Sequence, residues 1–425
     1  MRSFKQLGVS HNPRPNQFYL PELTLFLHHM SKKGLNLSTF LEEELKPIRA
    51  IYLASYVPMK CGIATFTKDL VHAINDQNPD APGEIVCSDD GMEEYTFPWD
   101  VKYKLSREDP GSYVSTAQYI NQSTADIVCL QHEFGIYGGN DGEYVLTLID
   151  LLEKPIVSCF HTILPHPTEH QKYIMQRIIE ASSAVIAMSE HSRRLLVQIY
   201  GCDEEDAVLI HHGVPNFEFT GTERYKKYLG IKAKHLLMMS GLIGPGKGIE
   251  YVIKAMPEIV KQNPDTKFYI QGKTHPGVIR SQKESYRESL INLTKELQVE
   301  DHVVFINQYL SLEELIEYYK AADFFLTPHL EPQQPTSGTL AYALGAGKVC
   351  ISTPFVYAQE MLSHNTGILV PFRESAPIAD AVNNVISKPE LMETYRNNAY
   401  KKGKTMQWPR VASKYLNLFK VIIEK

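Results

Sequence analysis

Short apolar runs alternate with amphipathic stretches along most of the chain, beginning at Arg49. Residues 50–56 predict a strand, residues 58–62 a turn, and residues 65–74 a helix with its apolar side chains on one face. Further strands are predicted at residues 127–130, 155–160, 184–188 and 208–210, with helices at 144–152 and 173–181. Such alternation is typical of a parallel sheet covered by helices.

The pattern is interrupted at residues 216–235, which are polar and charged, and we place a domain boundary there. It then restarts, with strands predicted at residues 236–240, 268–271, 302–306, 324–327, 349–352 and 368–370. The predicted fold class is α/β, with Rossmann-like domains at residues 49–218 and 235–405. Ligands of such sheets bind beyond the carboxyl ends of the strands, so the site is expected in a cleft between two facing sheets. Residues 1–48 form an N-terminal extension with two short predicted helices, at 21–30 and 37–45, and no readable role.

The composition argues against a nucleic-acid-binding, membrane-spanning or disulfide-rich protein. The 425 residues are 43% apolar, and 43 basic against 49 acidic residues give a net charge of -6 without long single-sign runs, so a nucleic-acid surface is not expected. Apolar runs stay shorter than a membrane span, and the N-terminus lacks the apolar core of a signal peptide, which predicts a cytoplasmic protein without a transmembrane segment. Six cysteines without C-x-x-C spacing predict reduced core thiols rather than disulfides or zinc ligands: Cys61, Cys87, Cys129, Cys159, Cys202 and Cys350.

The segment from 329 to 354 combines a strand end, a proline-rich turn, a helix start and a new strand. Thr336 or Ser337 is expected to cap the helix. Its first turn, Ser337, Gly338 and Thr339, then presents open backbone N–H groups suited to a phosphate. A capped structural helix explains the same pattern equally well.

A second glycine-rich turn, GLIGPGKG at residues 241–248, follows a predicted strand and precedes a helical pattern. Its spacing approaches that of a P-loop, but Gly248 stands where the magnesium-binding hydroxyl belongs, which disfavours a magnesium-dependent nucleotide hydrolase. A backbone nest at Gly246 with the Lys247 ammonium remains, able to hold a diphosphate without metal. The alternative is a plain glycine turn with a solvated lysine.

These two motifs and the paired Rossmann-like halves resemble a retaining GT-B glycosyltransferase of the large family-four type, the glycosyl transferases group 1. The resemblance covers the chain from about Arg49. It implies that Lys247 holds the donor diphosphate, whereas Leu242 replaces a family arginine. The family's Glu-x7-Glu pair falls on Gln334 and Tyr342, and Glu331 is the candidate replacement for a carboxylate there.

The same resemblance assigns further site residues. Glu360 corresponds to a glutamate associated with the sugar nucleotide, Gly62 to a donor-facing glycine loop, and His161 to a strand-end histidine beside the reacting sugar. Each also has a plain structural reading, as a solvated glutamate, an ordinary turn glycine and a structural histidine. Helix 409–425 is expected to pack back on the first domain.

The loop at residues 131–141 mixes polar side chains, aromatic rings and glycines, which suits an acceptor site. His132, Glu133 and Asp141 are its candidate acceptor-binding residues, and a mobile surface loop is the alternative.

The predicted function is transfer of a sugar, with mannose as first choice, from GDP-mannose or UDP-glucose to a hydroxyl of a sugar or glycan acceptor. Retention of configuration, no metal and no cofactor besides the nucleotide sugar are expected. Two alternatives stay open: a non-catalytic GT-B regulatory or binding protein, and a GT-B sugar-nucleotide epimerase. The oligomeric state is left open.

Overall fold

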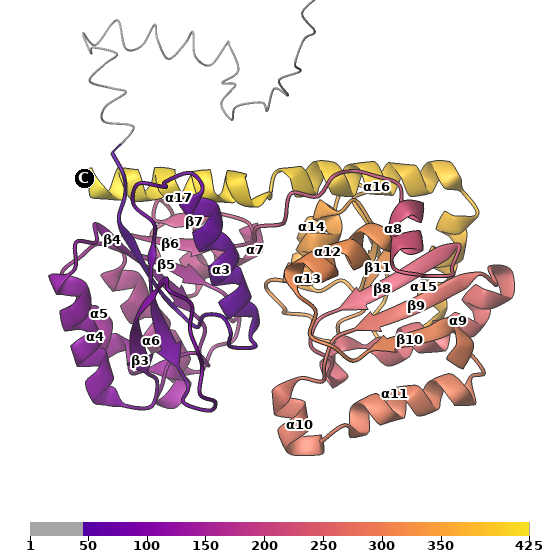
Figure 1. Ribbon diagram of the computed structural model, residues 1–425, viewed down its shortest axis with the longest axis horizontal. Coiled ribbons are helices and arrows are strands. Elements are labelled where there is room, and N and C mark those ends of the chain that lie inside the picture. Colours follow the sequence, from indigo (N-terminus) through magenta and orange to yellow (C-terminus); the bar gives the residue numbers. More distant parts are fainter. Residues whose placement is uncertain (1–45, 425) are drawn as a thin grey trace, which may run out of the picture. The chain divides into compact units, whose positions relative to one another are not determined.

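The computed structural model describes residues 46–424, so residues 1–45 of the predicted N-terminal extension, with its helices at 21–30 and 37–45, lie outside the described residues. From Ile48 onward the chain forms one unit containing two parallel sheets flanked by helices (Figure 1). This confirms the predicted α/β class with two parallel-sheet domains.

The first sheet has seven parallel strands in the order β3-β2-β1-β4-β5-β6-β7. In sequence order these are β1 (Ala50–Ala54), β2 (Glu84–Asp89), β3 (Val101–Ser106), β4 (Ile127–His132), β5 (Ile156–Phe160), β6 (Ala184–Ala187) and β7 (Ala207–Leu209). The helices between them are α3 (Gly62–Asn75), α4 (Pro110–Gln122), α5 (Val145–Leu151), α6 (Glu169–Ala181) and α7 (Glu190–Gln198), with the short 3-10 helix η1 (Asn140–Gly142).

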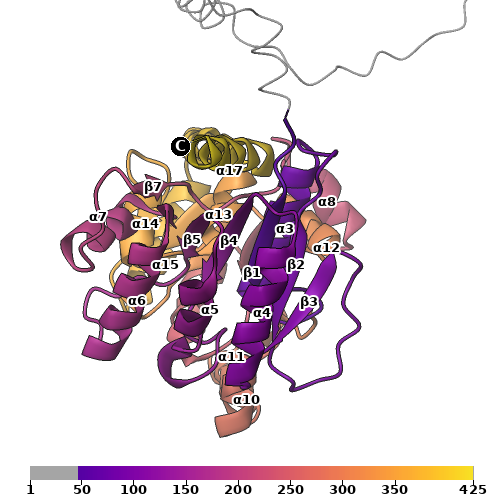
Figure 2. The ribbon, with the colours of Figure 1, turned by 90° about the vertical axis from the view of Figure 1, so that its left-hand side faces the viewer.

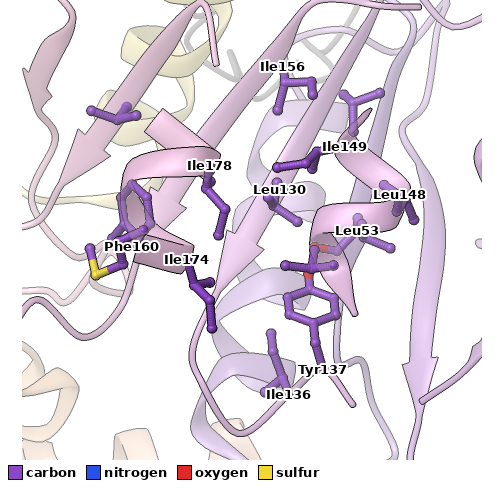
Figure 3. Packing of buried hydrophobic residues seen from close by; sticks show 14 of the residues in the cluster. Leu53, Leu130, Ile136, Tyr137, Leu148, Ile149, Ile156, Phe160, Ile174 and Ile178 are labelled. Atoms are coloured by element: carbon purple, nitrogen blue, oxygen red, sulfur yellow. The ribbon is translucent and has the colours of Figure 1, made fainter. Parts of the chain in front are cut away.

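Alternate side chains of the first sheet enter two cores, because successive residues of a strand point to opposite faces. Leu53 and Leu130 pack against α5 and α6 on one face, together with Tyr137 (Figure 3). Ala50 and Tyr52 pack on the other face, against α3 and the C-terminal helix α17 (Trp408–Ile423). Figure 2 shows α4, α5 and α6 side by side over their face of the sheet.

The second sheet has six parallel strands in the order β10-β9-β8-β11-β12-β13. They are β8 (His235–Ser240), β9 (Thr266–Gln271), β10 (Val303–Ile306), β11 (Phe324–Thr327), β12 (Val349–Ser352) and β13 (Ile368–Leu369). The helices are α8 (Glu223–Tyr228), α9 (Ile249–Gln262), α10 (Pro276–Gln282), α11 (Ser285–Glu296), α12 (Leu312–Ala321), α13 (Gly338–Gly345), α14 (Val356–Met361), α15 (Ala376–Ile386) and α16 (Pro389–Lys404), with 3-10 turns η2 (Pro245–Lys247) and η3 (Glu300–His302).

Two strands, β2 and β3, are absent from the sequence prediction. β3 is an edge strand in which exposed lysines alternate with the partly buried Val101 and Tyr103 and the buried Leu105, so it lacks the continuous apolar run that marks the central strands. All six cysteines are free, and five of them are buried, as expected for core thiols. None of the helices in the described part of the chain is long and apolar enough to cross a membrane.

Candidate functional site

The glycine-rich turn after β8 is pressed against the loop that follows β11. Gly248 adopts a φ of 65°, and a Cβ added there would lie 2.0 Å from the Pro328 carbonyl oxygen, so a larger residue does not fit. The Leu330 N–H donates to the Gly246 carbonyl at 2.9 Å. These two contacts bring Lys247, on η2, beside the end of β11.

Lys247 heads a directed chain of hydrogen bonds. Its ammonium lies 3.4 Å from His329 Nε2, and His329 Nδ1 lies 2.9 Å from Gln334 Oε1. An ammonium only donates, so Nε2 accepts and Nδ1–H donates to Gln334, whose amide N–H groups face the Thr336 carbonyl at 3.0 Å. Burial, with a smaller effect of the Lys247 charge, lowers the pKa of His329 to about 3, which keeps this ring neutral.

The same loop leads into α13. The Ser337 hydroxyl accepts the Leu340 N–H at 3.3 Å and is the N-cap, one of the two caps that the sequence predicts. No hydrogen bond within the described residues uses the N–H groups of Gly338 and Thr339. The start of α13 therefore keeps the two open donors expected of an anion-binding helix terminus.

In the first sheet, the ends of β4 and β5 are tied together. His161 Nε2 lies 2.9 Å from Gln131 Oε1, and the His161 N–H donates to the His132 carbonyl at 3.0 Å. The Thr162 hydroxyl donates to the Glu133 carboxylate. Burial lowers the pKa of His161 to about 3 and raises that of Glu133, so His161 is neutral at physiological pH.

The three predicted acceptor residues lie in different surroundings. His132 is fully buried among rings, and within the described residues both of its ring nitrogens lack a hydrogen-bond partner. Asp141 lies on η1, where its carboxylate lies 3.3 Å from His170 Nδ1 and 3.2 Å from Gln171 Nε2. Glu133 is partly buried and bound to Thr162. The structure thus places the His132 ring in the core and only the other two side chains near the surface.

Several contacts join the strand ends of the two sheets. A Cβ on Gly338 would lie 2.9 Å from His212 Nε2, and Phe66 makes edge contacts with both His212 and His161, with ring centroids 5.0 and 4.9 Å apart. The first turn of α13 is therefore linked to His161 through two rings. Gly62, at the start of α3, has open space around its Cα.

Glu360 and Tyr342 make the other two links. The Glu360 carboxylate accepts the N–H groups of Glu190 and His191, at 3.0 and 3.1 Å, at the start of α7. The Tyr342 hydroxyl donates to Asp69 on α3 at 3.0 Å. Where the resemblance expects the second glutamate of its pair, the protein thus has a tyrosine bound to a carboxylate on α3, a helix of the first half.

Glu331, the candidate replacement for the first glutamate, is exposed and accepts the Gln333 N–H within its own turn, at 3.0 Å. Three buried or partly buried groups of this region are absent from the residues that the sequence singles out: His212, His329 and Asp69. The two histidines carry a usable signal, because each follows a predicted strand, whereas nothing local marks Asp69.

Comparison with known proteins decides the family. Residues 62–216 match the model of Glycosyltransferase Family 4, and residues 222–402 match that of Glycosyl transferases group 1. The two matches together show that the chain belongs to the glycosyltransferases of the family-four, group 1 type. Its GT-B fold is shared with Anabaena HepE, whose crystal structure in complex with UDP and glucose has a TM-score of 0.70 at 17% identity and covers 88% of this chain and 99% of that one.

Two relatives bear on the family's chemistry. A D-inositol 3-phosphate glycosyltransferase of Kineococcus radiotolerans is 24% identical over 262 residues, 59% of this chain and 59% of that protein. The match thus spans less than two thirds of that relative's length. A phosphatidyl-myo-inositol mannosyltransferase of Mycolicibacterium smegmatis is 21% identical over 367 residues, 85% of this chain and 88% of that protein.

Proposed function

We propose that this glycosyltransferase family member transfers a sugar from a nucleotide diphosphate donor to a hydroxyl acceptor. The observation that carries the proposal is that three groups lie beyond strands of the two sheets: the Lys247 ammonium, the open start of α13 and the neutral His161. The last two are linked through His212 and Phe66. These are the groups that hold a diphosphate and orient a sugar hydroxyl.

In this proposal the diphosphate is the leaving group, and negative charge grows on it as the glycosidic bond breaks. Lys247 and the N–H groups of Gly338 and Thr339 are fixed in advance toward that charge, with Ser337 capping the helix and Gly246 closing the turn. His161, neutral in the folded protein, accepts a hydrogen bond from a sugar hydroxyl. Glu133 and Asp141 are assigned to the acceptor, and Gly62 leaves room for substrate.

The two positions without a glutamate limit the chemistry. Gln334 is neutral and occupied by His329 and Thr336, so it orients its neighbours without supplying negative charge. Transfer with retention by front-face attack needs no protein nucleophile, and this is the course we propose. We also propose that catalysis needs no metal ion, because Gly248 stands where a P-loop has its magnesium-binding hydroxyl.

Mannose is proposed as the sugar, with GDP-mannose as donor, because a relative is named a mannosyltransferase. Glucose from UDP-glucose is the second choice, since HepE was crystallised with UDP-glucose. Inositol phosphate and phosphatidylinositol are the first acceptors to test, since two relatives are named for inositol-containing compounds.

The test is incubation of the protein with each nucleotide sugar, with and without these acceptors, followed by product analysis with and without EDTA. A new glycoside formed equally in EDTA supports the proposal. An isomerised donor would instead identify an epimerase, and tight donor binding without turnover a non-catalytic member. Activity abolished by EDTA and restored by Mg²⁺ would contradict metal independence.

A further inference from the structure

Gln131 is buried at the junction of β4 and β5, and its side chain contacts His161. It has no exposed surface, and its main-chain carbonyl accepts the Tyr137 hydroxyl at 2.8 Å. The sequence pattern includes this glutamine in the candidate acceptor loop at residues 131–141 but gives its side chain no role of its own. A buried amide must satisfy its donors and its acceptor locally, so the direction of its hydrogen bonds carries information.

The side-chain amide of Gln131 contacts two neighbours, with its nitrogen toward one and its oxygen toward the other. The Gln131 amide nitrogen lies 3.3 Å from the Cys129 sulfur, and its oxygen lies 2.9 Å from His161 Nε2. Burial raises the pKa of Cys129 well above that of a free thiol, so the sulfur stays neutral. Because the amide oxygen can only accept, the proton of the neutral His161 ring must be on Nε2.

The other ring nitrogen of His161 is left as a free acceptor. No hydrogen bond to Nδ1 forms within the described residues, and Nδ1 is not among the enclosed, unpaired atoms. The His161 backbone is held by its N–H bond to the His132 carbonyl, and its ring makes an edge contact with the Phe66 ring at an interplanar angle of 90°.

We propose that Gln131 is a positioning residue that fixes His161 in its Nε2–H tautomer and so makes Nδ1 a hydrogen-bond acceptor for a sugar hydroxyl. The role assigned to His161 rests on the proposed function, whereas the tautomer does not. A lone pair at Nδ1 selects groups that donate. His161 therefore recognises a hydroxyl of the sugar and is unsuited to phosphate oxygens, which only accept.

The first experiment is independent of activity. Long-range ¹⁵N–¹H correlation on protein with labelled histidine reports the tautomer of each ring, and His161→Ala identifies the signal. We expect a neutral Nε2–H ring that does not titrate between pH 5 and 8. An Nδ1–H ring, or titration within that range, would overturn the proposal whether or not the protein proves to be a glycosyltransferase.

Two substitutions then test the consequence for substrate. Gln131→Leu removes the acceptor, and we expect kcat to fall about tenfold, the effect of one hydrogen bond, with KM for the nucleotide sugar little changed. Gln131→Glu places a carboxylate on Nε2–H, which favours the imidazolium and removes the Nδ1 lone pair at low pH. The acid limb of the kcat profile should then move to higher pH, a shift that lost packing alone does not cause.

Gln176→Leu is the matched control, because Gln176 is a partly buried glutamine of the same half, and its side chain donates to the Tyr200 carbonyl at 3.3 Å. It should leave the His161 signal and the pH profile unchanged. An unchanged profile in Gln131→Glu would count against the proposal. Should Gln131→Leu fail to fold, the wild-type spectrum and the pH profile of Gln131→Glu still test the tautomer and the role of Gln131. Absence of any transfer by the wild-type protein would contradict the proposed function and leave the tautomer standing.

Discussion

The Lys247 side chain carries one positive charge and is partly buried, and this burial lowers its pKa. We predict that Lys247→Ala weakens binding of a nucleoside diphosphate by about 1.5 to 3 kcal/mol, the usual value of a charge-assisted hydrogen bond, or roughly 10- to 100-fold. Titration calorimetry at low salt measures it, with Lys261→Ala, an exposed lysine of α9, as control. Because the pKa is lowered, the Lys247-dependent affinity should also decline at a lower alkaline pH than for a free lysine. Equal affinity of the mutant and the wild type would place the diphosphate elsewhere.

Gln334 illustrates how one amide differs from the carboxylate expected at its position. Gln334→Glu keeps the acceptor for His329 but loses the donor to Thr336, and it favours a charged His329 beside the Lys247 ammonium. We therefore predict a loss of about 1 to 3 kcal/mol of unfolding free energy and weaker diphosphate binding. Urea unfolding and calorimetry measure the two effects. A gain in turnover without loss of stability would show that a carboxylate is tolerated there and that this chain of hydrogen bonds is not needed.

At the scale of elements, the first turn of α7 is capped by a side chain of α14, a helix of the second half. The carboxylate of Glu360, on α14, accepts two N–H groups of the α7 first turn, as an N-cap side chain does. Glu360→Ala should lower the unfolding free energy by about 1 to 3 kcal/mol, because two partly buried donors lose their partner. Thermal unfolding measures it, with the exposed Glu374→Ala as control. If Glu360→Ala leaves the stability unchanged and weakens binding of the nucleotide sugar, Glu360 binds the donor and does not act as a cap.

At the scale of the whole molecule, the bond between Tyr342 and Asp69 couples the two sheets. Burial raises the pKa of Asp69, so the carboxylate depends on the donor it receives. A double-mutant cycle with Tyr342→Phe and Asp69→Asn should give a coupling of about 1.5 to 3 kcal/mol in unfolding free energy. Strict additivity of the two changes would mean that the bond does not form in solution.

Buried neutral histidines make the whole molecule sensitive to acid. Burial lowers the pKa of His132 to about 3, whereas the unfolded chain binds its proton near pH 6.5. The stability is therefore intact above pH 6.5 and falls as the pH drops from 6.5 toward 3, by about 2 kcal/mol for this group at pH 5. His132→Phe should reduce the difference in unfolding free energy between pH 7.5 and 5 by about that amount, measured in urea. His166→Gln, at an exposed site, should not, and an unchanged difference in His132→Phe would contradict the buried neutral ring.

The sequence determined the class of the fold and most of the strands, because apolar periodicity and strand-end turns are local properties. The apolar run at residues 324–327 is β11 residue for residue, and the predicted capping region contains Ser337, the observed N-cap. The glycine turn at 241–248 also lies between β8 and α9 as its pattern indicates. Edge strand β3 was not predicted, because its apolar residues alternate with lysines and do not form the continuous apolar run by which the central strands were recognised.

Only the tertiary structure decided the partners of the site residues. Tyr342 and Asp69 are 273 residues apart, His161 and Gln131 are 30 apart, and no local pattern links either pair. The sequence around Glu360 fits a solvated glutamate on a helix surface as well as it fits a cap on a helix of the other half, and only the structure distinguishes the two. Hydrogen-bond direction, burial and ring tautomer depend on which groups meet in space, and these properties determine what a residue can do chemically.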